Sequence, residues 1–381
     1  MKYFLLAGEA SGDLHGSQLI KSIKQYDAEA QFSFFGGDMM ASEAGVEPLV
    51  HYRNMAYMGI VEVVKHLREI LGFLSRAKRV IDQWQPDAVV LIDYPSFNLK
   101  VAKYAFSHRI KTFYFISPKV WAWKEYRVKQ IKKYITALYS ILPFETEFFA
   151  RHGYDVCYVG NPTVNEIGEA RKQFADMATF CKRNGLSQKP ILAIVPGSRK
   201  KEISDNLPTM VRAASAFPDY QMVIAGAPGI DEAYYGEVLG NECLACNIPV
   251  VEGQSFELVA DARVALVTSG TATLETAVLG TPQVVCYRMG ASKVVYFLYK
   301  HFLKVKYVSL PNLIVGKEVI PELLLHHCDV PTVKHHLEQL LPDTEQRRAM
   351  LDGYEAMKQR LGENSCTDTA AKMMIAALGQ K

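Results

Sequence analysis

The sequence lacks the features that mark several large classes of protein. Its 381 residues hold only seven cysteines at irregular spacing, unlike the dense, paired cysteines of a small disulfide-stabilised secreted domain. No stretch approaches the roughly 18 consecutive apolar residues of a membrane-spanning helix. The formal charge is only +3, from 43 basic and 40 acidic residues, so the overall charge does not indicate a nucleic-acid partner. We therefore expect a cytoplasmic globular protein that binds no nucleic acid.

The two common phosphate-binding loops are also missing from the N-terminus. The apolar run at residues 3–7 is followed by GEASGD at residues 8–13, which has neither the Lys-Ser/Thr ending of a P-loop nor G-x-G-x-x-G spacing. Its two carboxylates, Glu9 and Asp13, would repel an anion. Phosphate groups are therefore expected to bind elsewhere.

The pattern that is present predicts two α/β domains. The chain is 49% hydrophobic, so it can bury a large core, and its length favours two domains over one. Short β-rich runs alternate with helix-period segments, which is typical of a doubly wound parallel sheet. The runs expected to form the strands of the two sheets are residues 3–7, 32–35, 88–92, 112–116 and 137–142, then 191–195, 221–225, 250–251, 264–268 and 283–287.

The predicted domains are residues 1–165 and 186–342, followed by C-terminal helices at 343–381 that pack back toward an N-terminal domain. The polar stretch between the first two domains, which begins near Asn161 and Pro162, is expected to connect them. Both domains are expected to face a central cleft, the default ligand site.

A candidate nucleotide site lies in the second half, at VTSGTATLETAVLGTP. Ser269, Gly270 and Thr271 follow a predicted strand and supply the start of a helix, whose free N–H groups and positive dipole end can hold a diphosphate. Glu275, in the first helical turns, can reach a ribose hydroxyl. The alternative is an ordinary helix cap with an acid that the dipole favours.

A second loop in the same domain, PGSRK, follows the strand at residues 191–195. Ser198 permits close backbone approach, and Arg199 can hold a phosphate through two hydrogen bonds. Because carboxyl ends of parallel strands meet at one edge of a sheet, the two loops are expected to converge.

In the first half, Asp93 directly follows the apolar run at residues 88–92. A carboxylate partly withdrawn from water there would have a raised pKa, as a general base near neutral pH requires. The alternative is an aspartate that begins a turn before Tyr94 and Pro95.

Together these residues resemble the lipid-A-disaccharide synthase family along essentially the whole chain. The motifs that carry the resemblance, in order, are GEASGD (8–13), MGIVEVV (58–64), IDYPSFN (92–98), SPKVWAW (117–123), LPFE (142–145), PGSR (196–199), SGTATLE (269–275), YRM (287–289) and SLPN (309–312). The resemblance implies a GT-B glycosyltransferase fold, two Rossmann-like domains around a cleft.

The resemblance also implies a reaction. UDP-2,3-diacylglucosamine would transfer its sugar to the 6-hydroxyl of 2,3-diacylglucosamine 1-phosphate, giving a β-1,6-linked disaccharide and UDP with inversion. No cofactor is expected, and no metal if protein groups neutralise the departing UDP. Peripheral contact with the cytoplasmic face of the inner membrane follows from the lipid substrates, and a homodimer is compatible with the sequence.

By the same resemblance, Asp93 is the leading base and Glu9 shares the acidic side of the site, with His15 as a third candidate. The residues expected on the acceptor side are Gly8, Ser11, Gly12 and Asp13. The residues expected on the UDP-sugar side are Ser198, Arg199, Ser269, Gly270 and Thr271 at the diphosphate, Glu275 at the ribose, Arg288 and Met289 near the uracil or diphosphate, and Asn312 as a further polar group.

The chain departs from the family pattern at one site position. Many members carry an acid where this chain has Ser96, so any role of that acid is absent or displaced here.

A surface for lipid is expected from an apolar stripe at helical spacing, although such a stripe is more often core. Two basic and aromatic stretches, residues 119–133 and 288–306, are expected to face anionic headgroups. The residues of the stripe are Ile60, Val63, Val64, Leu67, Ile70, Leu71 and Leu74.

Two other functions remain open on the sequence alone. One is another GT-B enzyme of UDP-N-acetylglucosamine, a transferase or a 2-epimerase, which would share the SGT loop. The other is a noncatalytic lipid or nucleotide carrier, which would not need Asp93.

Overall fold

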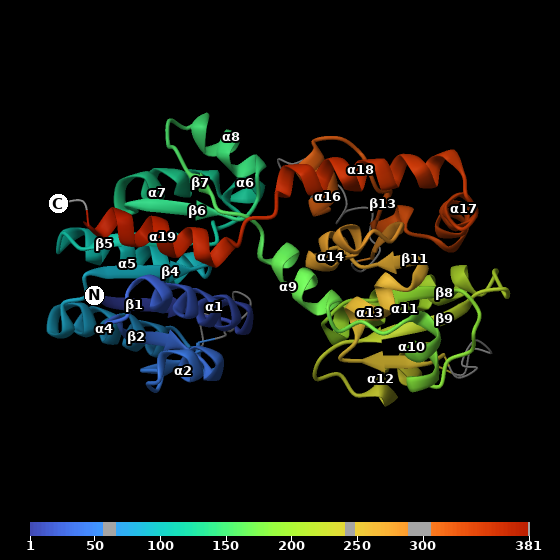
Figure 1. Ribbon diagram of the computed structural model, residues 1–381, viewed down its shortest axis with the longest axis horizontal. Coiled ribbons are helices and arrows are strands. Elements are labelled where there is room, and N and C mark those ends of the chain that lie inside the picture. The colour runs from blue at the N-terminus through green and yellow to red at the C-terminus, as the bar shows by residue number, and fades with distance from the viewer. Residues whose placement is uncertain (56–65, 241–247, 289–305, 380–381) are drawn as a thin grey trace. The chain divides into compact units, whose positions relative to one another are not determined.

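The chain forms two compact units (Figure 1). The computed structural model describes residues 1–55, 66–240, 248–288 and 306–379. The first unit comprises Met1–Pro162 and Glu363–Lys381, and the second comprises Thr163–Gly362. The motif at residues 58–64, and with it Ile60, Val63 and Val64, lies outside the described residues.

The first unit is built on a parallel sheet with strand order β3-β2-β1-β4-β5-β6-β7. The central strands are almost entirely apolar, as expected for strands covered by helices on both faces. The strands are β1 (Lys2–Ala7), β2 (Gln31–Gly36), β3 (Val50–His51), β4 (Ala88–Ile92), β5 (Lys111–Phe115), β6 (Ala137–Ser140) and β7 (Cys157–Tyr158).

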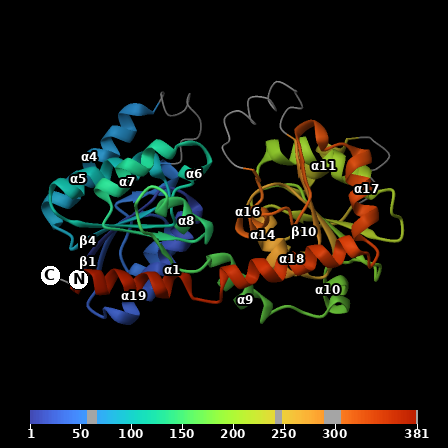
Figure 2. The ribbon, with the colours of Figure 1, turned by 90° about the horizontal axis from the view of Figure 1, so that it is seen from above.

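Two apolar cores sandwich this sheet, because successive strand residues point to opposite faces. One face packs against α4 (Leu67–Trp84), α5 (Pro95–Ser107), α7 (Val128–Tyr134) and α8 (Phe144–Ala150). The other packs against α1 (Ala10–Tyr26), α2 (Asp38–Ala44) and α19 (Cys366–Gly379). Figure 2 shows the two helical layers edge-on. Short α6 (Val120–Trp123) lies in the connection between β5 and α7, and one-turn 3-10 helices span Tyr52–Asn54 and Glu125–Arg127.

The second unit repeats this plan, with strand order β10-β9-β8-β11-β12-β13, all parallel. Its strands are β8 (Ile191–Val195), β9 (Gln221–Gly226), β10 (Val250–Glu252), β11 (Ala262–Val267), β12 (Gln283–Tyr287) and β13 (Glu322–Leu324). Its helices are α9 (Pro162–Arg171), α10 (Met177–Arg183), α11 (Lys200–Ala214), α12 (Glu232–Leu239), α13 (Ser255–Ala260), α14 (Thr271–Leu279), α16 (Leu310–Val315), α17 (Val330–Leu340) and α18 (Glu345–Leu361), with a 3-10 turn at Leu325–His327.

All ten predicted strands occur, with ends within about two residues of those expected. Strands β3, β7 and β13 were not predicted, because each has only two or three residues and carries no periodicity of its own. Doubly wound parallel sheets, the predicted fold class, are confirmed in both units.

The two C-terminal helices belong to different units. Helix α18 packs against α14, α16 and α17 of the second unit, so its residues do not return to the first unit as the sequence predicted for the whole of 343–381. Helix α19 does return and lies beside α1, with Cys366, Ala370, Ala371 and Met374 buried against it (Figures 1 and 2). The change of unit falls at Gly362, which ends α18.

This division predicts that two buried methionines stabilise different units, so that only Met374→Ala weakens the first unit. Met374→Ala leaves a cavity in the first unit and should lower its free energy of unfolding by about 2–5 kcal/mol. Met357→Ala makes the same change on α18 in the second unit. All three tryptophans lie in the first unit, so tryptophan fluorescence during urea unfolding reports on that unit. A fluorescence midpoint that moves as much for Met357→Ala as for Met374→Ala would contradict the division.

Candidate active site

Each sheet has one point where the chain reverses its direction of growth, and the predicted motifs meet there. In the first unit β1 lies between β2 and β4, with Ala7 paired to Ile92, so GEASGD and Asp93 leave neighbouring strand ends. In the second unit β8 adjoins β11, with Val195 paired to Val267, so PGSR and SGT leave neighbouring strand ends. Ligands of open α/β sheets bind at such reversal points, outside the carboxyl ends of the strands.

Asp93 lies in a strained turn between β4 and α5. Asp93 and Tyr94 both have left-handed backbone conformations, with φ of 42° and 47°, which cost energy for residues other than glycine. The carbonyl oxygen of Asp93 accepts hydrogen bonds from the Tyr114 hydroxyl and from Asn98 Nδ2, the latter at 2.7 Å. Pro95 then begins α5 with a preset φ. Surrounding side chains therefore hold the aspartate in a conformation that its own backbone disfavours.

The GEASGD loop packs directly on this turn. A Cβ placed on Gly8 would lie 2.5 Å from Cγ of Tyr94, so only glycine lets the tyrosine ring cover the loop. The Tyr94 hydroxyl donates to the carbonyl oxygen of Met55 at 2.9 Å, which fixes the ring. The glycine of this motif thus serves the position of Asp93.

Asp93 has the electrostatics expected of a base. Burial raises the pKa of its carboxyl, while the charge of Lys119 and the backbone N–H of Tyr94 act in the opposite direction. Burial lowers the pKa of His15 to about 4, so its imidazole is a weak base at neutral pH. Burial thus shifts the pKa values of the two groups in opposite directions, toward a stronger base for Asp93 and a weaker base for His15.

Glu9 and Ser11 flank the same strand end. Glu9 is the N-cap residue of α1 and is half-buried, and its charge helps to raise the pKa of the Tyr94 hydroxyl after the larger effect of burial. Glu9 therefore lies near the tyrosine that covers Gly8. Ser11 is exposed in the first turn of α1, whereas Gly12 is buried under the helix.

Asp13 has a structural role, which corrects its assignment to the acceptor. Its Oδ1 accepts from the backbone N–H groups of Gly37 at 2.7 Å and Met40 at 3.2 Å, and its Oδ2 accepts from Met39 at 3.1 Å. The carboxylate is buried and caps the N-terminus of α2, a favourable position for negative charge. The sequence did not reveal this because the partners lie 24 to 27 residues away.

A buried glutamate, missed in the sequence, anchors the next loop. Glu145 is 1% exposed and accepts hydrogen bonds from Trp121 Nε1 at 2.9 Å and from the Ser140 hydroxyl. Trp121 also packs edge-on against Phe144, with ring centroids 5.0 Å apart. Burial raises the pKa of Glu145 to about 7, although hydrogen bonds from Ser140, Trp121 and Ser117 and the charge of Lys119 oppose it. The SPKVWAW and LPFE motifs are thus parts of one anchor.

Ser96 has a partner from this loop. Its hydroxyl accepts a hydrogen bond from Arg127 Nη2 at 2.9 Å, at the start of α5. A neutral hydroxyl therefore stands beside the guanidinium of Arg127.

In the second unit, the PGSR loop is closed by a glutamate that the sequence analysis did not single out. Glu202 accepts from the backbone N–H of Ser198 at 3.1 Å and from Arg199 Nη1 at 3.1 Å. Gly197 has φ of 117°, and a Cβ there would lie 2.7 Å from the Glu202 Cβ. Ser198 and Arg199 are exposed. The carboxylate thus occupies donors that would otherwise meet an external anion.

The SGT loop ends β11 and begins α14 as predicted. Gly270 and Thr271 are exposed and Ser269 is half-buried. Burial raises the pKa of Glu275, and the nearby Glu166 raises it further, while a hydrogen bond with Thr271 lowers it. Glu166, on α9, was not predicted as a site residue, because nothing in its local sequence places it beside α14.

Arg288 follows β12 and is bound to α11. Its backbone N–H donates to Asn206 Oδ1 at 2.7 Å, and its Nη1 donates to Thr209 Oγ1 at 2.6 Å. The guanidinium is half-buried on the helix that follows the PGSR loop. Met289 lies outside the described residues.

Asn312 is a structural residue, which corrects its assignment as an accessible polar group. It is fully buried, and its Oδ1 accepts from the N–H groups of Val319 at 2.7 Å and Ile320 at 3.0 Å. Its Nδ2 donates to the Ile320 carbonyl at 2.9 Å and to Glu322 Oε1 at 2.8 Å. No hydrogen-bonding capacity remains for a ligand that would have to enter the core.

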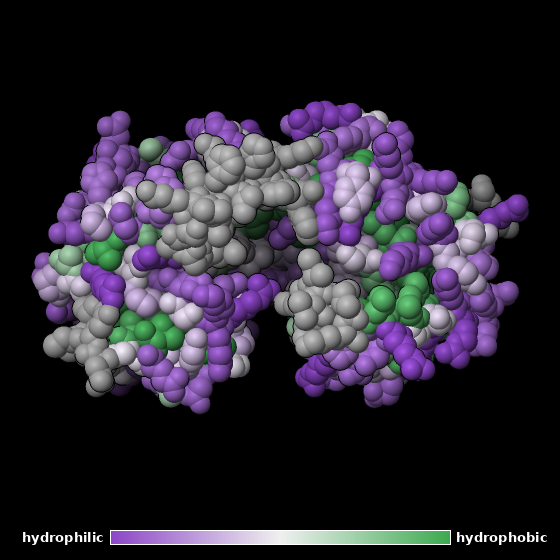
Figure 3. Space-filling view, turned by 180° about the vertical axis from the view of Figure 1, so that it is seen from behind, coloured by the Kyte–Doolittle hydropathy of each residue, from purple (hydrophilic) through white to green (hydrophobic). Residues whose placement is uncertain are grey.

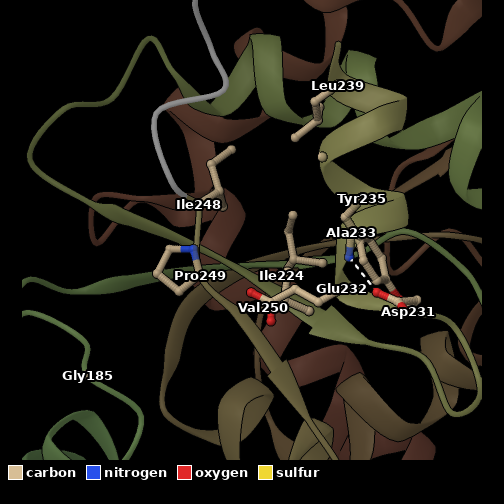
Figure 4. A pocket seen from close by; sticks show the side chains of 11 residues that line it. Gly185, Ile224, Asp231, Glu232, Ala233, Tyr235, Leu239, Ile248, Pro249 and Val250 are labelled. Atoms are coloured by element: carbon tan, nitrogen blue, oxygen red, sulfur yellow. Dashed lines mark hydrogen bonds between the residues drawn. The ribbon is translucent and has the colours of Figure 1, made fainter. Parts of the chain in front are cut away.

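Two cavities in the second unit lie apart from the predicted residues. One, of about 780 Å³, lies between α12 and the sheet (Figure 4). Its lining residues are Gly185, Ile224, Asp231, Glu232, Ala233, Tyr235, Gly236, Leu239, Ile248, Pro249 and Val250. The other, of about 570 Å³, lies at the ends of β9 and β10 and is lined in part by Gly226, Gly253 and the Arg183–Glu257 ion pair. Within the described ranges, no group of three or more His, Cys, Asp or Glu side chains is arranged to hold a metal ion.

The Glu145 anchor makes the stability of the first unit depend on pH. A carboxyl whose pKa rises from about 4.5 to about 7 on folding binds more protons when folded, so its contribution is full below pH 4.5 and is lost as pH rises through 7. Glu145→Gln cannot ionise, so wild type should lose on the order of 3 kcal/mol relative to this variant between pH 5 and 8. Tryptophan-monitored urea unfolding across that range measures the difference. A difference that stays constant with pH would contradict the buried, raised carboxyl.

Solved structures share this two-unit fold at low sequence identity. UDP-GlcNAc 2-epimerase from Neisseria meningitidis, bound to UDP-GlcNAc, aligns over 100% of both chains with a TM-score of 0.65 and 12% identity. The calicheamicin glycosyltransferase CalG4 aligns over 99% of this chain and 98% of its own, with a TM-score of 0.59 and 17% identity. These likenesses confirm the predicted GT-B fold, and they show the fold alone.

Proteins related in sequence identify the family, which the solved structures do not. The model of the family described as lipid-A-disaccharide synthetase matches residues 3–376. The lipid-A-disaccharide synthase of Nitrosococcus oceani is 34% identical, over 98% of this chain and 95% of that protein. The synthase of Myxococcus xanthus is 35% identical, over 99% of this chain and 97% of that protein. With matched motifs at both sheet reversal points and homology along nearly its entire length, the chain belongs to the lipid-A-disaccharide synthase family, which are glycosyltransferases.

Proposed function

We propose that the chain carries out the reaction of this family with Asp93 as the base. UDP-2,3-diacylglucosamine is the donor and 2,3-diacylglucosamine 1-phosphate the acceptor. The observation that carries the proposal is the pair of reversal points, one with a partly buried carboxylate and one with exposed N–H groups and an arginine. A base and an anion site are the two functions that the reaction needs.

The proposed chemistry is a single in-line displacement. The acceptor 6-oxygen forms a bond to the anomeric carbon of the donor as the bond from that carbon to the UDP oxygen breaks, and UDP leaves with the electron pair. The proton of the 6-hydroxyl moves to the Asp93 carboxylate. Burial raises the pKa of that carboxyl, which makes it a stronger base, while the charge of Lys119 acts in the opposite direction.

Glu9 and Ser11 complete the proposed acceptor side. A carboxylate beside Tyr94 can accept sugar hydroxyls or stabilise the positive charge that develops at the anomeric carbon. Asp13 is left out, because its carboxylate is committed to α2.

On the donor side, the diphosphate is proposed to bind between the PGSR and SGT loops. Ser198 and Arg199 exchange their hydrogen bonds with Glu202 for bonds to phosphate, while Ser269, Gly270 and Thr271 offer the N-terminus of α14. Glu275 is placed to accept a ribose hydroxyl. Arg199 and Arg288 can take up the charge of the departing UDP, so the proposal requires no metal.

Lipid substrates call for contact with a membrane surface, proposed here as peripheral and on the cytoplasmic face. No described helix has both the length and the apolar character to cross a bilayer. Leu67 and Leu71, one turn apart on α4, are each 48% exposed, which suits shallow contact with acyl chains. On the face drawn in Figure 3, hydrophobic areas are small and set in a largely hydrophilic surface.

The epimerase alternative is favoured only by fold likeness at 11–14% identity to several UDP-N-acetylglucosamine 2-epimerases. An epimerase would turn over the donor without an acceptor. The requirement for both lipids therefore separates the two functions.

The test is UDP release from the purified protein with both lipids in detergent and EDTA. Wild type should release UDP only when both lipids are present, and Asp93→Asn should lose about 10²–10⁴-fold in kcat because the base is gone. For wild type, kcat/KM should fall as pH drops through the raised pKa of Asp93. Asp155→Asn, an exposed aspartate of the same unit, is the matched control and should keep full activity.

UDP release from the donor alone would contradict the transferase. Full activity in Asp93→Asn would leave the enzyme in place and remove Asp93 as its base.

A further inference from the structure

The loop between β5 and α7 brings two cations to the base. The backbone N–H of Asp93 donates to the carbonyl oxygen of Phe115 at 3.4 Å, so this loop begins beside the aspartate. Its far end returns to the same turn, where Arg127 donates to Ser96 at 2.9 Å. Lys119, between the two, is exposed, and its charge acts on Asp93.

Neither cation forms an ion pair within the described part of the chain, although the charge of Lys119 acts on the carboxyls of Asp93 and Glu145. Lys119 and Arg127 form no ion pair with any described carboxylate within 4 Å. The acid of the same loop, Glu125, pairs instead with His152 at 3.1 Å. Arg127 uses one of its five N–H donors in the hydrogen bond to the neutral Ser96 hydroxyl. Its positive charge and its other donors remain available to another acceptor.

A hydrogen bond to a buried carboxyl anchors the loop that carries Lys119 and Arg127. Trp121 lies between Lys119 and Arg127 in the sequence, and its ring N–H is bound to the buried Glu145 carboxyl. Arg127 also lies close enough to Tyr114 to act on its hydroxyl, which in turn holds the Asp93 carbonyl. Arg127 is therefore held beside the turn of Asp93, and the loop that carries Lys119 is anchored at Trp121.

We propose that Arg127 and Lys119 form the subsite for the phosphate of the acceptor. The inference rests on the proposed function. When the 6-hydroxyl of the acceptor lies at Asp93, its 1-phosphate lies on the other side of a single sugar ring. A phosphate there would find a planar guanidinium able to form two hydrogen bonds, and an ammonium, both next to the base.

This subsite would select the acceptor. A sugar without the 1-phosphate could still present its hydroxyl to Asp93 but would leave the two cations unpaired. Because the Ser96 hydroxyl is neutral, its hydrogen bond leaves the positive charge of Arg127 available to a phosphate.

The test compares two acceptors, 2,3-diacylglucosamine 1-phosphate and the same lipid without phosphate, in wild type and Arg127→Gln. Wild type should prefer the phosphorylated acceptor. Arg127→Gln should raise the KM for it about 10–100-fold, the effect of losing a charged hydrogen bond, and leave the donor KM and the KM for the unphosphorylated acceptor unchanged. Arg127→Lys should recover part of the loss. Lys103→Gln, an exposed lysine farther along α5, is the control and should behave as wild type.

Equal losses with both acceptors, or a change in the donor KM alone, would overturn the subsite. If Arg127→Gln fails to fold by tryptophan fluorescence, Lys119→Gln carries the same comparison, and an unchanged acceptor preference in that variant overturns the proposal. Wild type that transfers to neither acceptor would refute the proposed function itself, whereas transfer with an unchanged preference in the variants would refute only the subsite.

Discussion

The candidate active site of the first unit depends on the hydrogen bonds that the carbonyl oxygen of Asp93 accepts. Hydrogen bonds from Tyr114 and Asn98 secure a backbone that is left-handed at two consecutive residues, which costs on the order of 1–3 kcal/mol for each. The Tyr94 ring then lies over Gly8, so the turn and the GEASGD loop support each other. In return, the Asp93 carboxyl stands at the carboxyl edge of the sheet, partly buried, where burial raises its pKa. Packing on both sides of the turn thus sets the position of the Asp93 carboxyl and raises its pKa.

Charges are divided between the two reversal points in a way that suits glycosyl transfer. The first unit offers carboxylates, Asp93 and Glu9, and two cations on the loop between β5 and α7, Lys119 and Arg127. The second offers helix N-termini and Arg199, with Glu202 holding the place of an anion. In the proposed reaction, the first unit supplies the base and the second unit supplies the diphosphate site.

Strands and helices were predictable because they depend on local pattern. Apolar runs of about five residues predicted the central strands, and Ser269, Gly270 and Thr271 predicted the start of α14. Of the four short edge strands in the described sheets, β10 was predicted from its apolar residues, whereas β3, β7 and β13 were not. The sequence analysis also did not predict that α18 ends at Gly362, where the chain passes from the second unit to the first.

For the site, motifs located the loops but did not distinguish accessible from buried polar groups. Asp13 and Asn312 belong to site motifs, yet both are buried and fully engaged with backbone groups distant in sequence. Glu145, Arg127 and Glu202 were missed for the converse reason, since their importance comes from partners such as Trp121, Ser96 and Ser198 that only the fold brings near. Hydrogen bonds between residues distant in sequence determine both which predicted residues are buried and which unpredicted residues matter. No local sequence pattern reveals such bonds.

The central claim is a single displacement at the donor anomeric carbon with Asp93 taking the proton. The configuration of the new glycosidic bond tests it most directly, measured by proton NMR on disaccharide made from the α-linked UDP donor and the phosphorylated acceptor in the presence of EDTA. The account predicts a β-1,6 linkage only, because one in-line attack inverts the carbon. An α linkage would mean two displacements or front-face attack, and it would contradict the proposed role of Asp93.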